Sequence, residues 1–168
     1  MHSDIFVVMG VSGCGKSTVG VKLAAALGVA FLEGDALHPE TNVARMAAGF
    51  ALGDGDREGW LQALAARIAE AHAADTGLVL SCSALKRSYR DILRSGAPGM
   101  RFLYLHGSED LLAGRMAART GHYMPLSLLA SQLSTLEAPG VDENAQGFDV
   151  AMPVEDIVAA VLNQRTEA

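Results

Sequence analysis

The sequence predicts an α/β fold, a five-stranded parallel sheet with helices on both faces, as one domain over residues 1–168. Three observations predict it. The stretch 10–17 reads GVSGCGKS, a complete G-x-x-x-x-G-K-[ST] phosphate-loop motif between an apolar segment and a helical one. Four further short apolar segments alternate with helical segments along the chain. The length of 168 residues, with half of them hydrophobic, suits one sizeable core.

Each residue type in the phosphate-loop motif has a physical task. Gly10, Gly13 and Gly15 allow backbone angles and close approaches that a Cβ atom would forbid. Successive N–H groups form a nest for anions, and the following helix adds the positive end of its dipole. Lys16 would reach the β- and γ-phosphates, and the Ser17 hydroxyl would coordinate Mg²⁺. We therefore expect a nucleoside triphosphate to bind at Gly10, Ser12, Gly13, Cys14, Gly15, Lys16, Ser17 and Thr18.

The expected strands are short apolar runs with the length and β-branching of buried parallel strands. Glycine, proline or polar residues bound most of these runs. The expected strands cover residues 5–9, 29–32, 78–80, 101–105 and 148–151.

The expected helices carry apolar residues at a spacing of three to four. Gly28 is expected to cap the first helix at its C-terminus, Ser108 to cap another at its N-terminus, and Pro153 to begin the last. Trp60 is expected in the core. The expected helices cover residues 18–27, 39–48, 57–73, 84–94, 109–120, 126–136 and 153–164.

Composition argues against several classes of protein. A net charge of −6 and an isoelectric point near 5.3 argue against a nucleic-acid partner. No apolar stretch approaches the ~20 residues of a membrane span, and the first residues lack the basic start of a signal peptide. Cys14 and Cys82 lie far apart, and the five histidines lack metal-ligand spacing. We expect a cytoplasmic protein with reduced thiols and no zinc site.

Asp35 is the first candidate for chemistry outside the motif. It follows the second expected strand, and ligands of an open parallel sheet gather at the carboxyl ends of its strands. We expect Asp35 beside the phosphate loop, although it could instead only cap a helix that begins at Pro39. The third strand ends in Ser81 and Cys82, where motor ATPases and many GTPase-like switches carry a magnesium-binding aspartate.

Basic side chains supply further candidates. Arg57 begins a helix directly after residues 54–56, so it either pairs with an aspartate there or binds a ligand. Lys86, in the first turn after the third strand, is expected to meet an anion. Arg87 and Arg90 are expected to be solvated at the surface.

Two long insertions separate the strands. The first, about 35–75, would bind an acceptor, and the second, about 115–130, would form a lid. Arg115 and Arg119 lie four apart on one helical face of the lid, where they either hold an anion between them or are solvated. Glycine and proline bound residues 121–125 like a hinged flap. This layout favours a small-molecule kinase.

Several stretches together resemble the gluconokinase family, in the shikimate-kinase-like branch of P-loop kinases with a nucleoside-monophosphate-kinase-like fold. The resemblance covers nearly the whole chain. Its Gly-Asp-x-x-His-Pro and Cys-Ser-Ala-Leu-Lys motifs are more discriminating than the phosphate loop alone. The stretches are 9–17, 31–39, 54–64, 82–86, 89–91, 119–122 and 132–139.

The resemblance implies phosphorylation of D-gluconate at its 6-hydroxyl by ATP, with Mg²⁺, in the cytoplasm, by a protein that is often a homodimer. It implies that Asp35 orients or deprotonates the acceptor hydroxyl and that Arg115 and Arg119 belong to a lid over ATP. By the same resemblance the catalytic residues would be Lys16, Asp35 and Arg119, and the metal would lie at Ser17 and Asp35. The sugar acid would contact Asp35, His38, Arg45, Arg57, Ser83, Lys86 and His122.

One position departs from the related pattern. Shikimate kinases carry an arginine just before a proline in the lid, whereas Met124 precedes Pro125 here. Arg119, or His122 when protonated, would then stabilise the transferred charge. Two other functions stay open: a kinase of shikimate or another small polyol acid, and a nucleotide-dependent switch ATPase without a small-molecule acceptor.

Overall fold

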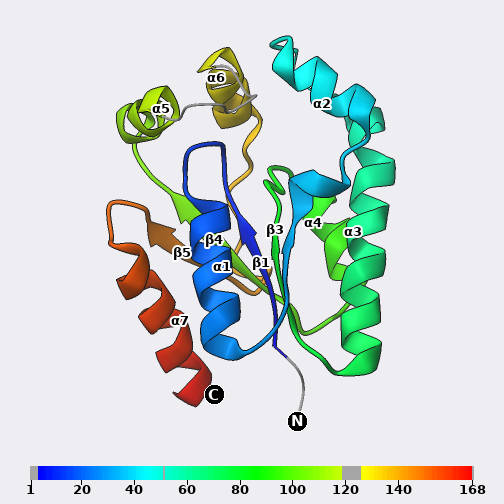
Figure 1. Cartoon of the computed structure of the whole chain (residues 1–168), viewed down its shortest axis with the longest axis vertical. Coiled ribbons are helices and arrows are strands. Elements are labelled where there is room, and N and C mark those ends of the chain that lie inside the picture. The colour runs from blue at the N-terminus through cyan, green and yellow to red at the C-terminus, as the bar shows by residue number, and fades with distance from the viewer. Residues whose placement is uncertain (1–3, 51, 119–125, 168) are drawn as a thin grey trace.

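The computed structural model describes residues 4–50, 52–118 and 126–167, and its core is a five-stranded sheet in which all strands are parallel (Figure 1). The strand order is β2-β3-β1-β4-β5, which confirms the predicted fold class. The strands are β1 (Ile5–Met9), β2 (Phe31–Glu33), β3 (Leu78–Ser81), β4 (Arg101–His106) and β5 (Ala145–Asp149).

Two strands are shifted relative to the prediction. β2 begins and ends later than the predicted 29–32, and β5 begins three residues before the predicted 148–151. The first residues of β5 are Ala145, Gln146 and Gly147, which carry no apolar run. β5 lies at the edge of the sheet, where a strand needs fewer apolar side chains, so hydrophobicity alone misplaced its start.

The helices follow the predicted order with two changed starts. α3 begins one turn early, because the Asp56 carboxylate accepts the Gly53 N–H at 2.9 Å and closes the first turn. α4 begins late, since Ala84 has a left-handed backbone (φ +48°) that no α-helix allows. The helices are α1 (Lys16–Leu27), η1 (Gly34–Leu37), α2 (Glu40–Ala47), α3 (Asp54–Ala74), α4 (Arg87–Arg94), α5 (Glu109–Ala118), α6 (Leu126–Thr135) and α7 (Val154–Glu167).

The central strand β1 shows how the sheet divides the core. Its alternate residues Phe6 and Val8 pack in the apolar cluster of α1 and α7, and Ile5, Val7 and Met9 pack in the cluster of α3 and α4. Figure 1 shows these two pairs of helices on opposite faces of the sheet. α2, α5 and α6 instead lie beyond the carboxyl ends of the strands. The sheet is therefore buried on both faces, and its carboxyl edge is left to loops and short helices.

A third, small apolar cluster joins the two predicted insertions. Met46 of α2, Leu52 before α3 and Leu128 of α6 are each less than a tenth exposed and pack together. The α2–α3 segment thus contacts α6, the helix that begins within the predicted lid. The insertion bounds, about 35–75 and 115–130, remain predictions.

The expectation that Arg90 is a surface residue is wrong. Its side chain is fully buried and pairs with Glu143, which is 1% exposed, through contacts of 2.7 and 3.2 Å. Arg90 Nη1 also donates to the carbonyls of Ala84 and Leu85, and Arg94 donates to Glu143 at 3.1 Å. This network fastens the segment before β5 to α4 and to the segment after β3. Helix periodicity could not reveal it, because the partner lies 53 residues away in a loop.

The electrostatics of this pair link stability to pH. Burial alone would raise the pKa of Glu143, but hydrogen bonds from Arg90, the Gly140 N–H and Arg94 outweigh it and lower the pKa to about 2, from an ordinary 4.5. The folded state therefore favours the charged carboxylate. The resulting stabilisation is fully present above about pH 4.5 and is lost as the pH falls toward 2.

We expect Glu143→Gln to lower the free energy of unfolding at pH 7 by about 3 kcal/mol, because it leaves Arg90 buried without its charge partner. Urea unfolding between pH 2 and 7 measures this, and the stability of the variant should fall less steeply below pH 4.5. Glu70→Gln, at an exposed carboxylate beside Arg67, is the control and should unfold like the wild type. Equal stability of Glu143→Gln and the wild type at pH 7 would contradict the assignment.

Candidate active site

The phosphate loop between β1 and α1 is held by close backbone approaches at two glycines. Gly10 has φ +146°, and a Cβ atom there would lie 2.5 Å from the Leu105 carbonyl oxygen at the end of β4. Gly13 has φ +85°, and its Cβ atom would lie 2.9 Å from the Leu112 carbonyl oxygen of α5. Neither position accepts a side chain without displacing backbone. The two glycines therefore fix the loop against β4 and α5.

Lys16 lies across this loop at the start of α1. Its ammonium donates to the carbonyls of Gly10 at 3.0 Å and Val11 at 3.2 Å. The Ser12 N–H donates to the side chain of Gln132 in α6 at 2.7 Å. Sequence reasoning gave Gln132 no role in the site, although it lies in a stretch that resembles the family. A positive charge, inward N–H groups and a helix N-terminus thus converge at one place, which suits phosphate.

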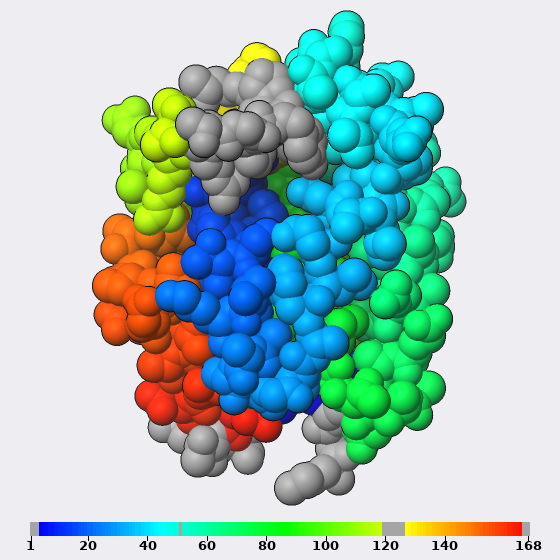
Figure 2. All heavy atoms as spheres, viewed as in Figure 1, coloured from blue at the N-terminus to red at the C-terminus, as the bar shows by residue number. Residues whose placement is uncertain are grey.

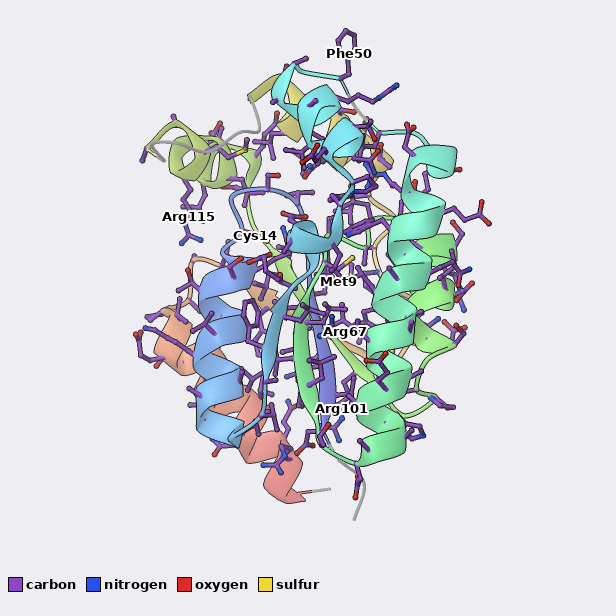
Figure 3. The ribbon with its side chains drawn as sticks, turned by 45° about the vertical axis from the view of Figure 1, so that its right-hand side comes forward. Met9, Cys14, Phe50, Arg67, Arg101 and Arg115 are labelled. Atoms are coloured by element: carbon purple, nitrogen blue, oxygen red, sulfur yellow. The ribbon has the colours of Figure 1, made fainter. Side chains whose placement is uncertain are left out.

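A cavity of about 340 Å³ opens beside the phosphate loop. Figure 3 shows Arg115 projecting from α5 next to the loop that carries Cys14, and its guanidinium donates to the Val150 carbonyl at 2.7 Å. The structure therefore brings Arg115 together with four predicted nucleotide residues around one hollow. The cavity is lined by Gly13, Cys14, Gly15, Thr18, Val19, Arg115, Ala118, Val150, Met152, Val154 and Ile157.

Glu33, at the end of β2, is a site residue that sequence reasoning missed. One oxygen of its carboxylate accepts the Ser17 hydroxyl, and the other accepts the Ser81 hydroxyl at the end of β3. The parallel pairing places Glu33 directly beside Ser81. Ser17 therefore contacts the carboxylate of Glu33. The metal site expected from the sequence instead paired Ser17 with Asp35. The sequence did contain a signal for Glu33, because a second carboxylate stands two residues before Asp35, at the end of the apolar strand.

The carboxylate and hydroxyls around Glu33 are a fitting set of donors for Mg²⁺. Hard cations prefer carboxylate and hydroxyl oxygens, and Glu33 and Ser17 provide both at the mouth of the phosphate loop. Ser81 takes the place of the aspartate that other P-loop proteins carry after this strand, and it holds the far oxygen of Glu33.

Asp35 lies in the short helix η1, and its side chain is 45% exposed. One carboxylate oxygen is 3.9 Å from His38 Nε2, whereas the His38 side chain is only 3% exposed. Because the His38 ring is this enclosed, it has no exposed surface for a sugar acid to contact. In the space-filling view the start of α1 lies between the η1–α2 segment on one side and α5 and α7 on the other (Figure 2). Asp35 therefore belongs to the segment that flanks the start of α1.

The basic residues in and beside the first insertion differ in whether a carboxylate neutralises them. Lys86 pairs with Asp54 at 3.0 Å, and Arg45, half exposed, pairs with Asp56 at 3.8 Å. Arg57 is 9% exposed and makes no ion pair with a carboxylate in the part of the chain that is described. Its Nε donates to the Leu52 carbonyl, at a long 3.4 Å. Asp54 and Asp56, the two aspartates just before Arg57 in the sequence, therefore pair with other cations.

Tyr89 brings Arg57 and Lys86 together. The Arg57 guanidinium lies 5.4 Å from the centre of the Tyr89 ring, and the Lys86 ammonium lies 5.7 Å from it. The Tyr89 hydroxyl donates to Asp54. Burial and this hydrogen bond raise the pKa of Tyr89 to about 12, so it stays a neutral donor. Two cations thus flank one ring at the base of the first insertion.

Of the remaining predicted site residues, Ser83 lies within the described structure. The Ser83 carbonyl accepts the Gly10 N–H at 3.2 Å, which docks the segment after β3 against the phosphate loop. Beside it, burial above all raises the pKa of Cys82 to about 12, so this thiol is unreactive. Arg119 and His122 lie outside the described residues.

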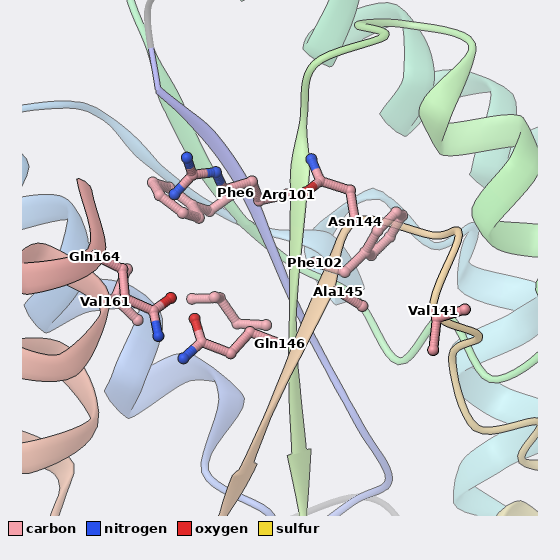
Figure 4. Close-up of a pocket in the computed structure, with 10 residues that line it drawn as sticks. Phe6, Arg101, Phe102, Val141, Asn144, Ala145, Gln146, Val161 and Gln164 are labelled. Atoms are coloured by element: carbon pink, nitrogen blue, oxygen red, sulfur yellow. The ribbon is translucent and has the colours of Figure 1, made fainter. Parts of the chain in front are cut away.

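A larger cavity, of about 440 Å³, lies at the other end of the sheet, where β4 and β5 begin (Figure 4). Its polar lining consists of Arg101 and the amides of Asn144, Gln146 and Gln164. No residue of the phosphate loop borders it. Its size alone therefore does not make it the active site.

Comparisons with known proteins agree with this geometry. The AAA domain family model matches residues 5–139. The chain is 43% identical over 159 residues to thermoresistant gluconokinase of Escherichia coli (strain K12), covering 94% of this chain and 91% of that protein.

Two solved structures are similar over nearly the whole chain. A sugar kinase from Janibacter sp. HTCC2649 has a TM-score of 0.92 and 44% identity, covering 96% of this chain and 93% of that one. A gluconokinase from Sinorhizobium meliloti 1021 has a TM-score of 0.81 and 54% identity, covering 93% and 87%. With sequence identity of this extent over chains of nearly matching length, the protein belongs to the gluconokinase family.

Proposed function

We propose that the protein transfers the γ-phosphoryl group of ATP to the 6-hydroxyl of D-gluconate, giving 6-phospho-D-gluconate. Relatives named gluconokinases support the activity. Arg57 is the observation that carries the choice of acceptor, because its buried guanidinium makes no ion pair with a described carboxylate. A buried cation of this kind favours an anionic ligand, and the carboxylate of gluconate supplies the missing charge.

ATP binding is assigned to the phosphate loop and its cavity. The loop N–H groups, the α1 N-terminus and Lys16 neutralise the phosphates, and Arg115 borders the hollow beside them. Phosphoryl transfer needs positioning and charge stabilisation more than covalent chemistry from the protein. Lys16 would leave the loop carbonyls of Gly10 and Val11 for the β- and γ-phosphates.

Ser17 and Glu33 would hold Mg²⁺. When bound, the ion neutralises charge on the β- and γ-phosphates. Ser81 keeps the Glu33 carboxylate aimed at Ser17. We therefore assign the metal to Glu33 and keep Asp35 for the acceptor.

Asp35 would orient the 6-hydroxyl for in-line attack and accept its proton. Its half-exposed carboxylate lies in η1, at the start of the first insertion, so an acceptor reaches it from solvent. Arg57 and Lys86 would bind the other end of the sugar acid, with Ser83 beside the phosphate loop.

Several finer assignments rest on the family resemblance and on the sequence. We propose that residues 115–130 form a lid, whose closure excludes water and in which Arg119, or His122 when protonated, stabilises the transferred charge. We also propose a cytoplasmic homodimer. Within the described ranges, no helix is long and apolar enough to cross a bilayer.

A coupled ADP-release assay with several acceptors tests the proposed function. We expect rapid ADP release with gluconate, and at least about 10³-fold lower kcat/KM with glucitol, which has the same chain but no carboxylate. Shikimate should be a poor acceptor. Equal rates with gluconate and glucitol, or the same ADP release without any acceptor, would contradict the proposal; the second result would indicate a switch ATPase.

Variants of Arg57 locate the carboxylate anchor within the same assay. Arg57→Ala should lower kcat/KM for gluconate far more than for glucitol, and Arg57→Lys should fall between this variant and the wild type. Arg67→Ala, at an exposed arginine of the same helix, is the matched control. A uniform loss with both acceptors would assign Arg57 to folding instead.

Kinetic experiments should distinguish the roles of Glu33, at the end of β2, and Asp35, which follows it. We expect Asp35→Asn to lower kcat with gluconate by about 100-fold while the KM for ATP stays near that of the wild type. Glu33→Gln should instead raise the Mg²⁺ concentration for half-maximal rate by about tenfold, with the rate largely restored at saturating Mg²⁺. Equal losses of ATP affinity and rate in Asp35→Asn would make Asp35 a nucleotide or metal residue.

A further inference from the structure

Behind Asp35 lies a buried polar cluster that the proposed mechanism does not use. The His38 ring stacks on the indole of Trp60, with ring centres 3.8 Å apart and planes 18° apart. Trp60 Nε1 donates to the carbonyl of Gly34, the residue before Asp35, at 2.8 Å. Trp60 therefore fixes both the His38 ring and the backbone that carries Asp35.

The protonation of His38 follows from its other neighbour, Asn42, which is 4% exposed. Asn42 Nδ2 donates to the Asp56 carbonyl at 2.8 Å, and turning the amide over would set two acceptor oxygens against each other. The same Nδ2 lies 3.3 Å from His38 Nδ1, so Nδ1 is the acceptor in this contact. A neutral His38 must then carry its proton on Nε2.

His38 is neutral at physiological pH. Its pKa is lowered to about 4, chiefly by burial; the charge of Asp35 opposes this effect, and the charge of Arg57 adds to it. A protonated ring would pair strongly with Asp35 and draw its carboxylate away from the acceptor. A neutral Nε2–H instead orients the carboxylate without neutralising it.

We propose that His38 is a positioning residue, whose neutral Nε2–H holds one oxygen of Asp35 and leaves the other for the acceptor hydroxyl. This inference rests on the proposed function, in which Asp35 acts on that hydroxyl. The separation of Nε2 and Asp35 Oδ1 is 3.9 Å, longer than a hydrogen bond. Because the Asp35 side chain is half exposed, a rotation of its carboxylate can close this contact when the acceptor hydroxyl takes the second oxygen. His38 itself does not touch the acceptor, since its ring is enclosed.

Two substitutions separate the Nε2–H donor from the stacked ring. His38→Phe keeps an aromatic ring on Trp60 but removes the donor. His38→Gln removes the ring but carries an amide N–H group with a reach close to that of Nε2. We expect kcat with gluconate to fall at least about tenfold in His38→Phe, because a hydrogen bond to a carboxylate is lost, with an unchanged KM for ATP. His38→Gln should recover most of the kcat.

Thermal unfolding of the same proteins should show the opposite order. His38→Phe keeps the stack and loses the contact from Asn42, whereas His38→Gln loses the stack, so His38→Phe should melt at the higher temperature of the two. His72→Gln, at an exposed histidine of α3, controls for the substitution.

Each outcome of these measurements decides the inference. A variant series in which kcat follows the melting temperature would overturn it, since His38 would then act only through packing. Two fully active variants, or two equally inactive ones, would also overturn it, because the Nε2–H would not be the group required. A wild type that turns over another acceptor but not gluconate would overturn the proposed function alone, and the His38 comparison would then be made with that acceptor.

Discussion

The parallel pairing of β2, β3 and β1 is the constraint on which the rest of the site depends. Because the three strands run in the same direction, they end at one edge of the sheet, and each delivers its next residues to the same place. Glu33 ends beside Ser81, and the segment after β3 ends beside Gly10. A shift of one residue in this register would turn the Glu33 carboxylate to the opposite face of the sheet and away from Ser17. The register therefore positions Glu33 and Ser17, the proposed metal ligands, beside the phosphate loop.

In the proposed function, the distribution of charges in and beside the first insertion selects the acceptor. Asp54 and Asp56 engage Lys86 and Arg45, and Arg57 is left buried against the Tyr89 ring, with a long contact to a carbonyl and no carboxylate partner among the described residues. A guanidinium in this position costs free energy in the empty site, and an anionic ligand recovers it. The proposed specificity for an acid over a polyol thus rests on Arg57, the same residue that weakens the empty structure.

Much of the fold and part of the site could be predicted from the sequence, because their signals are local. The phosphate-loop motif, the Gly28 cap and the alternation of strands and helices each lie within a few residues, and the structure contains all three. The roles of Arg90 and His38 could not be predicted, because they depend on Glu143, which is distant in the sequence, and on stacking with Trp60. Glu33 is different, since its spacing from Asp35 was visible; what the sequence lacked was the register that sets it against Ser17.

The orientation of the bound sugar acid is the central claim, and a crystal structure with gluconate and a non-hydrolysable ATP analogue tests it most directly. We predict the gluconate carboxylate within hydrogen-bond distance of the Arg57 guanidinium and the 6-hydroxyl against Asp35, facing the γ-phosphate position above Lys16. Gluconate bound in the opposite direction, with its carboxylate at Asp35 or away from Arg57, would contradict the account.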